Sequence, residues 1–247
     1  TLSPPALAYT FLGFPSKGAE NVKALGDVRV RQAIIKAIDR TQILEAWYGD
    51  LAKELKPAEA LCSKEQLGCS YAKPVPAFDP AGAKKLLAEA GYADGFDVVI
   101  STFPLNNVEA TAVAGMLRAV GIRASIRQHP IAQRVQLLSQ GKVDIGYYGW
   151  SGGAVFEVSS QFARHFTSKE YDDPVLTKMA SETFTMMDDE ARRAAVAKVL
   201  EYATEHAYAF PMIPSRPVIT HSKEVQVLGR EEMRASQVTP IHEFGWK

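Results

Sequence analysis

The hydrophobic pattern in the middle of the chain switches repeatedly between two periods. Residues 96–102, 122–127 and 143–148 are short apolar or alternating runs, as expected of strands. Residues 108–120 and 130–141 repeat their apolar positions at helical spacing, and a glycine stands at or directly after the end of each. The pattern predicts an α/β fold with a parallel βαβαβ core, and right-handed crossovers would place both helices on one face of the sheet.

Five further segments show helical spacing, and two short extended segments follow them. The expected helices are 27–39, 41–47, 79–91, 173–187 and 189–206, and the expected strands are 209–213 and 217–220. In the first helix, the residues expected to face solvent are Arg29, Arg31, Gln32 and Lys36. In the fourth, the expected buried stripe is Leu176, Met179, Ala180, Phe184 and Met187. Three prolines in or between the last two segments, Pro211, Pro214 and Pro217, favour edge or inter-lobe strands over central ones.

The third run of the core leads into an aromatic, glycine-rich segment, Tyr147-Tyr148-Gly149-Trp150-Ser151-Gly152-Gly153. The carboxyl ends of parallel strands line the crevice in which open α/β sheets hold ligands. Trp150 is expected just past the strand, between glycines, where an aromatic ring can meet a ligand. The alternative is that the aromatic residues of this segment are simply core.

Composition limits the class of protein. Hydrophobic residues make up 47% of the 247 residues, which is enough for a sizeable core. Lys plus Arg and Asp plus Glu number 28 each, so the basic footprint of a nucleic-acid binder is missing and no nucleic-acid partner is expected. No apolar run is long enough to cross a bilayer, and we expect any signal peptide to lie outside this sequence.

Cys62 and Cys69 flank six residues in a stretch rich in Pro, Gly and Ser. A disulfide between them would close a small loop, contribute roughly 2.5 kcal/mol by chain-entropy reckoning, and suit an oxidising compartment. The alternative is a pair of reduced surface thiols. The five histidines are dispersed, and neither a nucleotide-binding glycine motif nor a metal-ligand cluster is present. We therefore expect no cofactor and no metal.

One enzymatic motif has to be weighed. Gly149-Trp150-Ser151-Gly152-Gly153 matches the G-x-S-x-G pattern of serine hydrolases, and acids at 172–173 with histidines at 206, 221 and 242 stand in a suitable order. However, residues 154–160 lack the helical stripe that should follow the nucleophile. A serine hydrolase that uses Ser151 is the alternative to a binding protein, and a scaffold that binds another protein through an apolar edge is a third option.

Several segments together resemble the extracellular solute-binding proteins of ABC importers, family 5, the dipeptide-, oligopeptide-, nickel- and opine-binding type. The matching segments, in the family's order, are Asp27–Ile34 with Ala37–Arg40, Gly149-Trp150, Asp189–Arg192 and Ala209–Pro214. The resemblance implies one lobe of a two-lobed, type II periplasmic-binding-protein-like fold. Residues 26–208 would form the C-terminal α/β ligand-binding lobe, 1–25 and 209–247 would be inter-lobe segments, and the N-terminal lobe would be absent. Apolar surface near the missing lobe would include Leu12, Phe14, Phe210 and Ile213.

The resemblance also implies a function without chemistry. A small solute, such as a peptide or an opine, would be captured in the inter-lobe cleft and passed to an ABC permease. The protein would be a monomer in the periplasm or outside the cell, associated with the membrane through the transporter. The ligand-binding residues implied are Tyr147, Trp150, Ser151, Gly152 and Gly153.

Two departures from the family pattern bear on the solute. Peptide binders commonly carry Asp three residues after the cleft Trp, where this chain has Gly153, and some oligopeptide binders carry Arg where this chain has Tyr147. A buried ammonium group without a carboxylate would be costly. We therefore expect an apolar, aromatic or sugar-like solute that stacks on Trp150 and Tyr147, with the backbone N–H groups of Ser151 to Gly153 available to an acceptor.

Overall fold

A computed structural model describes residues 8–18, 22–62, 66, 68–71, 75–151, 158, 165–166, 171–215, 222–227 and 244–246. The strands are β1 (Ala8–Gly13), β2 (Asp97–Thr102), β3 (Arg123–Gln128), β4 (Ile145–Ser151), β5 (Ala209–Pro214), β6 (Val225–Val227) and β7 (Phe244–Trp246). The α-helices are α1 (Val28–Lys36), α2 (Arg40–Tyr48), α3 (Pro80–Glu89), α4 (Asn107–Ala119), α5 (Ile131–Ser139), α7 (Pro174–Thr185) and α8 (Asp189–Glu205). Short 3-10 turns are η1 (Lys23–Gly26), η2 (Gly49–Glu54) and η3 (Pro104–Asn106).

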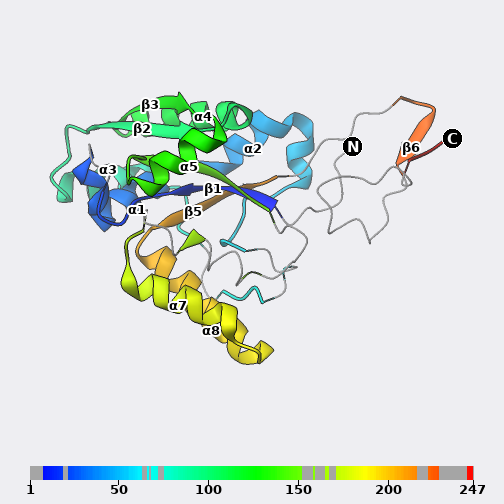
Figure 1. The fold of residues 1–247 in the computed structure, drawn as a ribbon. Coiled ribbons are helices and arrows are strands. Elements are labelled where there is room, and N and C mark those ends of the chain that lie inside the picture. Colours follow the sequence, from blue (N-terminus) through cyan, green and yellow to red (C-terminus); the bar gives the residue numbers. More distant parts are fainter. Residues whose placement is uncertain are drawn as a thin grey trace.

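The main sheet has five strands in the order β3-β2-β4-β1-β5 (Figure 1). β2 pairs in parallel with β3 and with β4, which confirms the predicted βαβαβ core. β1 pairs antiparallel with both β4 and β5, so the sheet is mixed. β5 lies at the edge, as its prolines predicted, whereas 217–220 fall outside the described residues. β6 and β7 form a separate antiparallel pair.

Local capping explains where the helices begin and end. The side chains of five aspartates accept backbone N–H groups at helix starts, namely Asp27 (α1), Asp39 (α2), Asp79 (α3), Asp173 (α7) and Asp188 (α8). α3 and α7 also have proline at the first helical position. Gly91, Gly121 and Gly141 follow α3, α4 and α5 with positive φ, as C-terminal glycines do.

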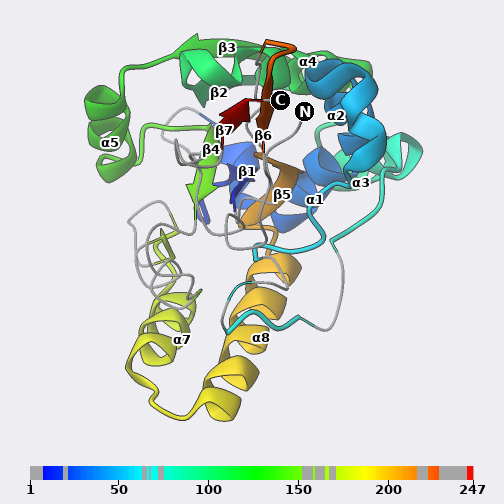
Figure 2. The same ribbon diagram turned by 90° about the vertical axis from the view of Figure 1, so that its right-hand side faces the viewer.

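Two hydrophobic clusters cover the two faces of the sheet. The first joins α1 to α4 to the inward side chains of β2, β3 and β4, and the second joins α7 and α8 to β1 and the cysteine segment. Figure 2 shows α7 and α8 on the other side of the sheet strands from α1 to α4. α4 contributes Val113 and Leu117 to the first cluster, whereas Leu138 of α5 packs against the second. The prediction that both helices share one face was therefore wrong. β3 and β4 flank β2 on opposite sides, so two right-handed crossovers lead to opposite faces.

Three further expectations about burial were wrong. Leu12, Phe14, Phe210 and Ile213 were expected at an uncovered apolar surface, but helices pack over them and all four lie in the first cluster. Arg31 was expected in solvent and is 3% exposed. The stripe of α7 buries Leu176, Ala180 and Thr183, while Phe184 and Met187 are exposed.

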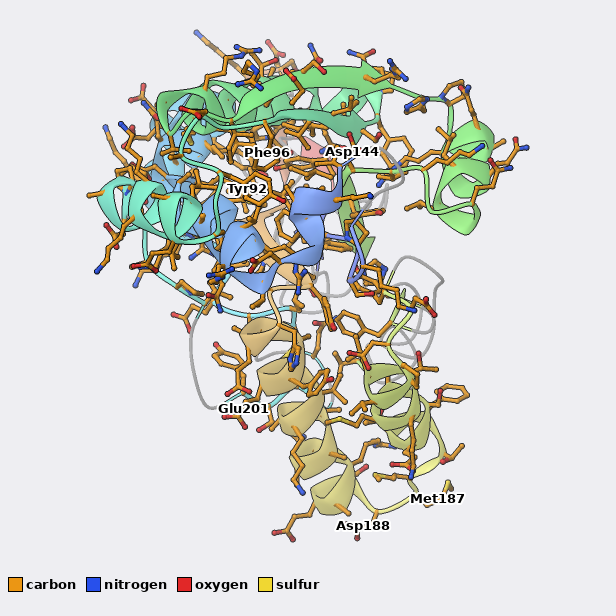
Figure 3. All side chains as sticks on the ribbon, turned by 90° about the vertical axis from the view of Figure 1, so that its left-hand side faces the viewer. Tyr92, Phe96, Asp144, Met187, Asp188 and Glu201 are labelled. Atoms are coloured by element: carbon orange, nitrogen blue, oxygen red, sulfur yellow. A yellow bond between two sulfur atoms is a disulfide. The ribbon has the colours of Figure 1, made fainter. Side chains whose placement is uncertain are left out.

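The exposure of Phe184 and Met187 follows from the position of α7. α7 and α8 form a hairpin that projects from the body, and Met187 lies at its far end (Figure 3). At that distance the sheet no longer covers α7, so only the side facing α8 is buried. Among the described residues, no helix combines the length and apolar character that a membrane crossing would need.

Candidate functional site

The order of the strands locates the crevice of the sheet. From β2 the chain crosses to β3 on one side, and it then returns past β2 to β4 on the other. Such a reversal is a topological switch point, and ligands of open α/β sheets bind outside the carboxyl ends of the strands there. The candidate site therefore lies beyond Thr102 of β2 and Ser151 of β4.

The strand that carries the predicted site is longer than expected. β4 continues through Gly149, Trp150 and Ser151, and the backbone of Trp150 pairs with Tyr9 of β1. Trp150 thus lies within the strand rather than past it, because β1 provides hydrogen-bond partners up to Ser151. Trp150 and Ser151 are described by their backbone alone, and Gly152 and Gly153 lie outside the described residues.

Tyr147 is a core residue. Its side chain is 0% exposed, and its hydroxyl lies 3.3 Å from Oγ1 of Thr10 and also hydrogen-bonds Glu109. Burial raises the pKa of Tyr147 well above its ordinary value, and burial likewise raises the pKa of Glu109. Asn106 donates to the Glu109 carboxyl at 3.1 Å. A solute could stack on Tyr147 only by opening the core, so the expected stacking on this ring does not fit its burial.

A buried arginine that the sequence reading did not single out lies at the switch point. Arg134 of α5 is 2% exposed, and its guanidinium carbon lies 4.2 Å from the ring centroid of Phe103 and 4.1 Å from that of Tyr148. The ring of Tyr148 also stacks on Phe11 at 5.0 Å. We call these four residues, Phe103, Arg134, Tyr148 and Phe11, the arginine column.

The neighbouring histidine is neutral at physiological pH. Burial, together with the positive charge of Arg134, lowers the pKa of His165 to about 3. Its ring contacts those of Phe11 and Tyr148, and its Nε2 lies 2.6 Å from the hydroxyl of Tyr171. The positive charge at this end of the sheet therefore comes from Arg134 and not from His165.

The structure does not support a nucleophile at Ser151. A hydrolase elbow requires a strained turn at the serine, but Ser151 has strand geometry opposite Ala8 of β1. Within the described residues, positive φ at a non-glycine position occurs at Asp172 and Ala207 only. His206 hydrogen-bonds within its own helix through Nδ1, 2.9 Å from the carbonyl of Tyr202. His221 and His242 lie outside the described residues.

The two cysteines form the predicted disulfide, Cys62–Cys69, and both are buried in the second cluster. Next to them, the hydroxyl of Tyr9 in β1 donates to the carbonyl of Leu61. The disulfide closes a loop within the cysteine segment, and the Tyr9 hydrogen bond and the second cluster hold this segment against the sheet. In the part of the chain that the structure describes, no three His, Cys, Asp or Glu side chains gather in a way that would hold a metal ion.

Comparisons with known proteins agree with the fold. The chain is 30% identical over 136 residues to heme-binding protein A of Haemophilus influenzae, covering 51% of this chain and 24% of that protein. It is 31% identical over 140 residues to the dipeptide-binding protein of Escherichia coli, covering 53% and 25%. The structure of the ABC transporter-associated periplasmic binding protein DppA from Helicobacter pylori, in complex with the peptide STSA, matches with a TM-score of 0.79 at 18% identity, covering 100% of this chain and 48% of that one.

The chain thus spans about half of that solved structure and about a quarter of each of those curated relatives. The family described as "Bacterial extracellular solute-binding proteins, family 5 Middle" matches residues 2–173, which is well over half of the chain. This chain belongs to the bacterial extracellular solute-binding proteins of family 5.

Proposed function

We propose that this chain is the C-terminal ligand-binding lobe of the solute-binding component of an ABC importer. It captures a small solute outside the cytoplasmic membrane, in a cleft between this lobe and an N-terminal lobe, and delivers the solute to the permease. The lobe comprises residues 26–208, with 1–25 and 209–247 as inter-lobe segments. The protein works as a monomer in the periplasm or at the cell surface.

One observation carries this proposal. The family match covers residues 2–173, and the fold match covers the whole chain but about half of a periplasmic binding protein of known structure. The strand order adds independent support, because it puts the switch point of the sheet at the ends of β2 and β4. The strand order thus supports a solute site at the edge that carries Trp150.

The proposed site consists of Trp150, Ser151, Gly152 and Gly153, supported from below by Tyr147. Trp150 would stack on an apolar, aromatic or sugar-like part of the solute, and the backbone N–H groups that follow it would meet an acceptor. Gly153 offers no carboxylate to an ammonium group. Peptides and opines are the solute classes that the family suggests. We propose that the site recognises a hydrogen-bond acceptor group of the solute rather than a free peptide amino terminus.

The test uses the full-length protein that contains this chain. Mass spectrometry of the protein purified under non-denaturing conditions identifies the bound solute, and calorimetry then gives its affinity for the wild type and two variants. Trp150→Ala should weaken binding at least about tenfold, as loss of an aromatic anchor does. Trp47→Ala is the matched control, because Trp47 is partly exposed on α2, away from the switch point, and should bind like the wild type. Equal affinity of both variants would refute the proposed site.

A serine hydrolase is the alternative that the sequence motif raised. The family is one of non-enzymatic solute-binding proteins, and Ser151 lies in a strand ladder. We expect a fluorophosphonate probe to leave the protein unlabelled under conditions that label a known serine hydrolase completely. Stoichiometric labelling that is lost in Ser151→Ala would favour catalysis instead.

A further inference from the structure

A buried carboxyl in the first turn of α4 has no cationic partner. Glu109 is 2% exposed, and it hydrogen-bonds the hydroxyl of Tyr147 in β4 and the side-chain amide of Asn106, which donates at 3.1 Å. Within the described part of the chain, no Lys, Arg or His side chain pairs with this carboxyl. Ionising a buried carboxyl without a cation is costly, so the neutral form is favoured and burial raises the pKa of Glu109.

The charged groups of the neighbouring elements leave Glu109 in this state. Arg134 contacts Tyr148, which points to the opposite face of the sheet from Tyr147 because successive residues of a strand alternate. Of the described residues, Tyr147 is the titratable group in contact with Glu109, and burial raises the pKa of its hydroxyl well above the ordinary value. The charged residues on the elements that pack against α4 do not hydrogen-bond with Glu109, and they are Asp97 in β2, Arg123 and Arg127 in β3, and Arg40 and Glu45 in α2.

Two hydroxyl groups connect Glu109 with the far edge of the sheet. The hydroxyl of Tyr147 lies 3.3 Å from Oγ1 of Thr10 in β1, and either oxygen can be the donor. Oγ1 of Thr10 in turn lies 3.5 Å from the carbonyl oxygen of Ile213 in β5, to which it donates. Thr10 stands where the register between β1 and β5 shifts. We call Glu109, Tyr147, Thr10 and the carbonyl of Ile213 the hydroxyl relay.

The protonation state of Glu109 sets the direction of the hydroxyl relay. A protonated carboxyl can donate, so Glu109 donates to Tyr147, Tyr147 to Thr10, and Thr10 to the carbonyl of Ile213. An ionised carboxylate only accepts, so Tyr147 donates to Glu109 and Thr10 donates to Tyr147. Because each hydroxyl carries one proton, the ionised state leaves none for Ile213. Loss of the proton in α4 thus removes a hydrogen bond between β1 and β5.

We propose that the hydroxyl relay is a pH-sensitive switch, in which protonation of Glu109 strengthens the attachment of β5 to β1 and ionisation of Glu109 weakens it. The switch lies in the core beneath α4, and its operation does not depend on where the solute binds. Its sign follows from the raised folded-state pKa of Glu109: the attachment is complete in acidic solution, and it is lost as the pH rises through that value.

The first test measures the protonation of Glu109 by infrared spectroscopy. The C=O stretch of protonated carboxyl groups is followed from about pH 4 to pH 9, which spans the ordinary pKa of Glu, near about 4.3, and the values of about 8–9 known for buried carboxyls. We expect part of the signal to persist after the exposed acids have ionised and to be missing in Glu109→Gln. Asp144, whose pKa burial also raises, is present in both proteins, so it cancels in the difference. Identical spectra of the wild type and Glu109→Gln would overturn the inference.

The second test follows the backbone N–H groups of β1 and β5 by hydrogen–deuterium exchange and mass spectrometry. Wild type and Glu109→Gln are compared at the same pH, because the intrinsic exchange rate is then equal. Gln keeps the size of the side chain and donates through its amide at every pH. The wild type should exchange like Glu109→Gln in acidic solution and about twofold to tenfold faster in alkaline solution, as expected from the loss of one hydrogen bond. A constant ratio of the two rates across the pH range contradicts the switch.

Three variants show whether the effect passes through the hydroxyl relay. Tyr147→Phe interrupts the relay and leaves Thr10 to donate to Ile213, so the exchange of β5 should match that of Glu109→Gln at every pH. Thr10→Val removes the donor and should give the faster exchange at every pH. Glu190→Gln removes an exposed charge from α8 and should behave like the wild type. Circular dichroism and urea unfolding show that each variant is folded. Wild-type pH dependence in Tyr147→Phe, or its loss in Glu190→Gln, would overturn the inference.

Discussion

Asp173 holds the α7–α8 hairpin to the body of the protein, and its removal is the sharpest test of how the fold is stabilised. Its carboxylate accepts the backbone N–H groups of Val175 and Leu176 at 2.8 and 3.1 Å, which caps α7. It also accepts hydrogen bonds from the hydroxyls of Tyr202, 3.0 Å away in α8, and of Tyr208, 2.7 Å away and directly before β5. One side chain thus connects two helices and the strand that follows them.

The cost of Asp173→Ala can be worked out from these contacts. Loss of the helix cap costs about 1 kcal/mol. Each tyrosine hydroxyl loses a charged acceptor, which costs roughly 1 kcal/mol here because Asp173 is partly exposed and water replaces part of the bond. We therefore expect the free energy of unfolding to fall by about 3 kcal/mol.

Asp188→Ala is the matched control. Asp188 caps α8 by accepting the N–H of Ala191 at 2.7 Å, and it lies at the far tip of the hairpin (Figure 3). Its removal should cost about 1 kcal/mol. Urea unfolding followed by circular dichroism should separate the two midpoints by roughly 0.8 M, for an m-value of about 2.5 kcal/mol/M. Equal midpoints would refute the reasoning, because the tyrosine bonds would then contribute nothing.

The pH dependence of the stability is an independent test of the role of Asp173. Partial burial alone would raise the pKa of Asp173, but the hydrogen bonds from Tyr208, Leu176, Tyr202 and Val175 outweigh it and hold the pKa below its ordinary value. A carboxylate with a lowered folded-state pKa stabilises the fold above its unfolded pKa, near about 4, and this stabilisation is lost as the pH falls through the folded value. The difference in the free energy of unfolding between wild type and Asp173→Ala should be largest above about pH 5 and should shrink in more acidic solution.

Two other predictions concern features away from the hairpin. Replacing Cys62 and Cys69 together by Ala, or reducing the disulfide, should lower the free energy of unfolding by about 2.5 kcal/mol. Urea unfolding with and without reductant measures this, and an unchanged midpoint would contradict it. Arg31→Met should lower the free energy of unfolding by about 2–4 kcal/mol, because the buried guanidinium donates to three backbone carbonyls at 2.7–3.1 Å that would lose their partner. The control Arg29→Met replaces an exposed side chain and should leave the urea midpoint unchanged. Similar midpoints for both variants would count against the buried role of Arg31.

The local parts of the fold could be predicted from sequence. The βαβαβ core follows from the change of hydrophobic period, and the starts of α3 and α7 follow from their Asp-Pro pairs. The disulfide follows from the spacing of two cysteines in a loop. Each of these features depends on residues close together in the chain, so a local pattern contains the information.

Features that depend on distant packing were missed. All six residues of β1 are buried, so it shows no alternation, and it pairs with β4 more than 130 residues later. Nothing local indicates that this segment enters the centre of the sheet. The same pairing lengthens β4 through Gly149 and Trp150, despite the low strand propensity of glycine.

The candidate site was predicted in part for the same reason. The segment 147–153 was singled out from its aromatic and glycine residues and stays a prediction as a site. Arg134 was not singled out, because a polar residue on a helix is normally expected in solvent. Its burial depends on Phe103, which directly follows β2, and on Tyr148 of β4, and both are distant from it in the chain. The predicted stripe of α7 was wrong in the opposite direction, because Phe184 is more apolar than Thr183, yet Thr183 is the residue that is buried.

The most direct test of the central claim compares the binding affinity of the whole protein with that of this chain alone. Calorimetry is performed with the solute that co-purifies with the full-length protein, first on that protein and then on the folded 247-residue chain. If the chain is one lobe that binds its solute in a shared cleft, the isolated chain should bind at least about 100-fold more weakly, because the contacts of the second lobe are missing. Equal affinity would contradict the account, since the site would then be complete within this chain.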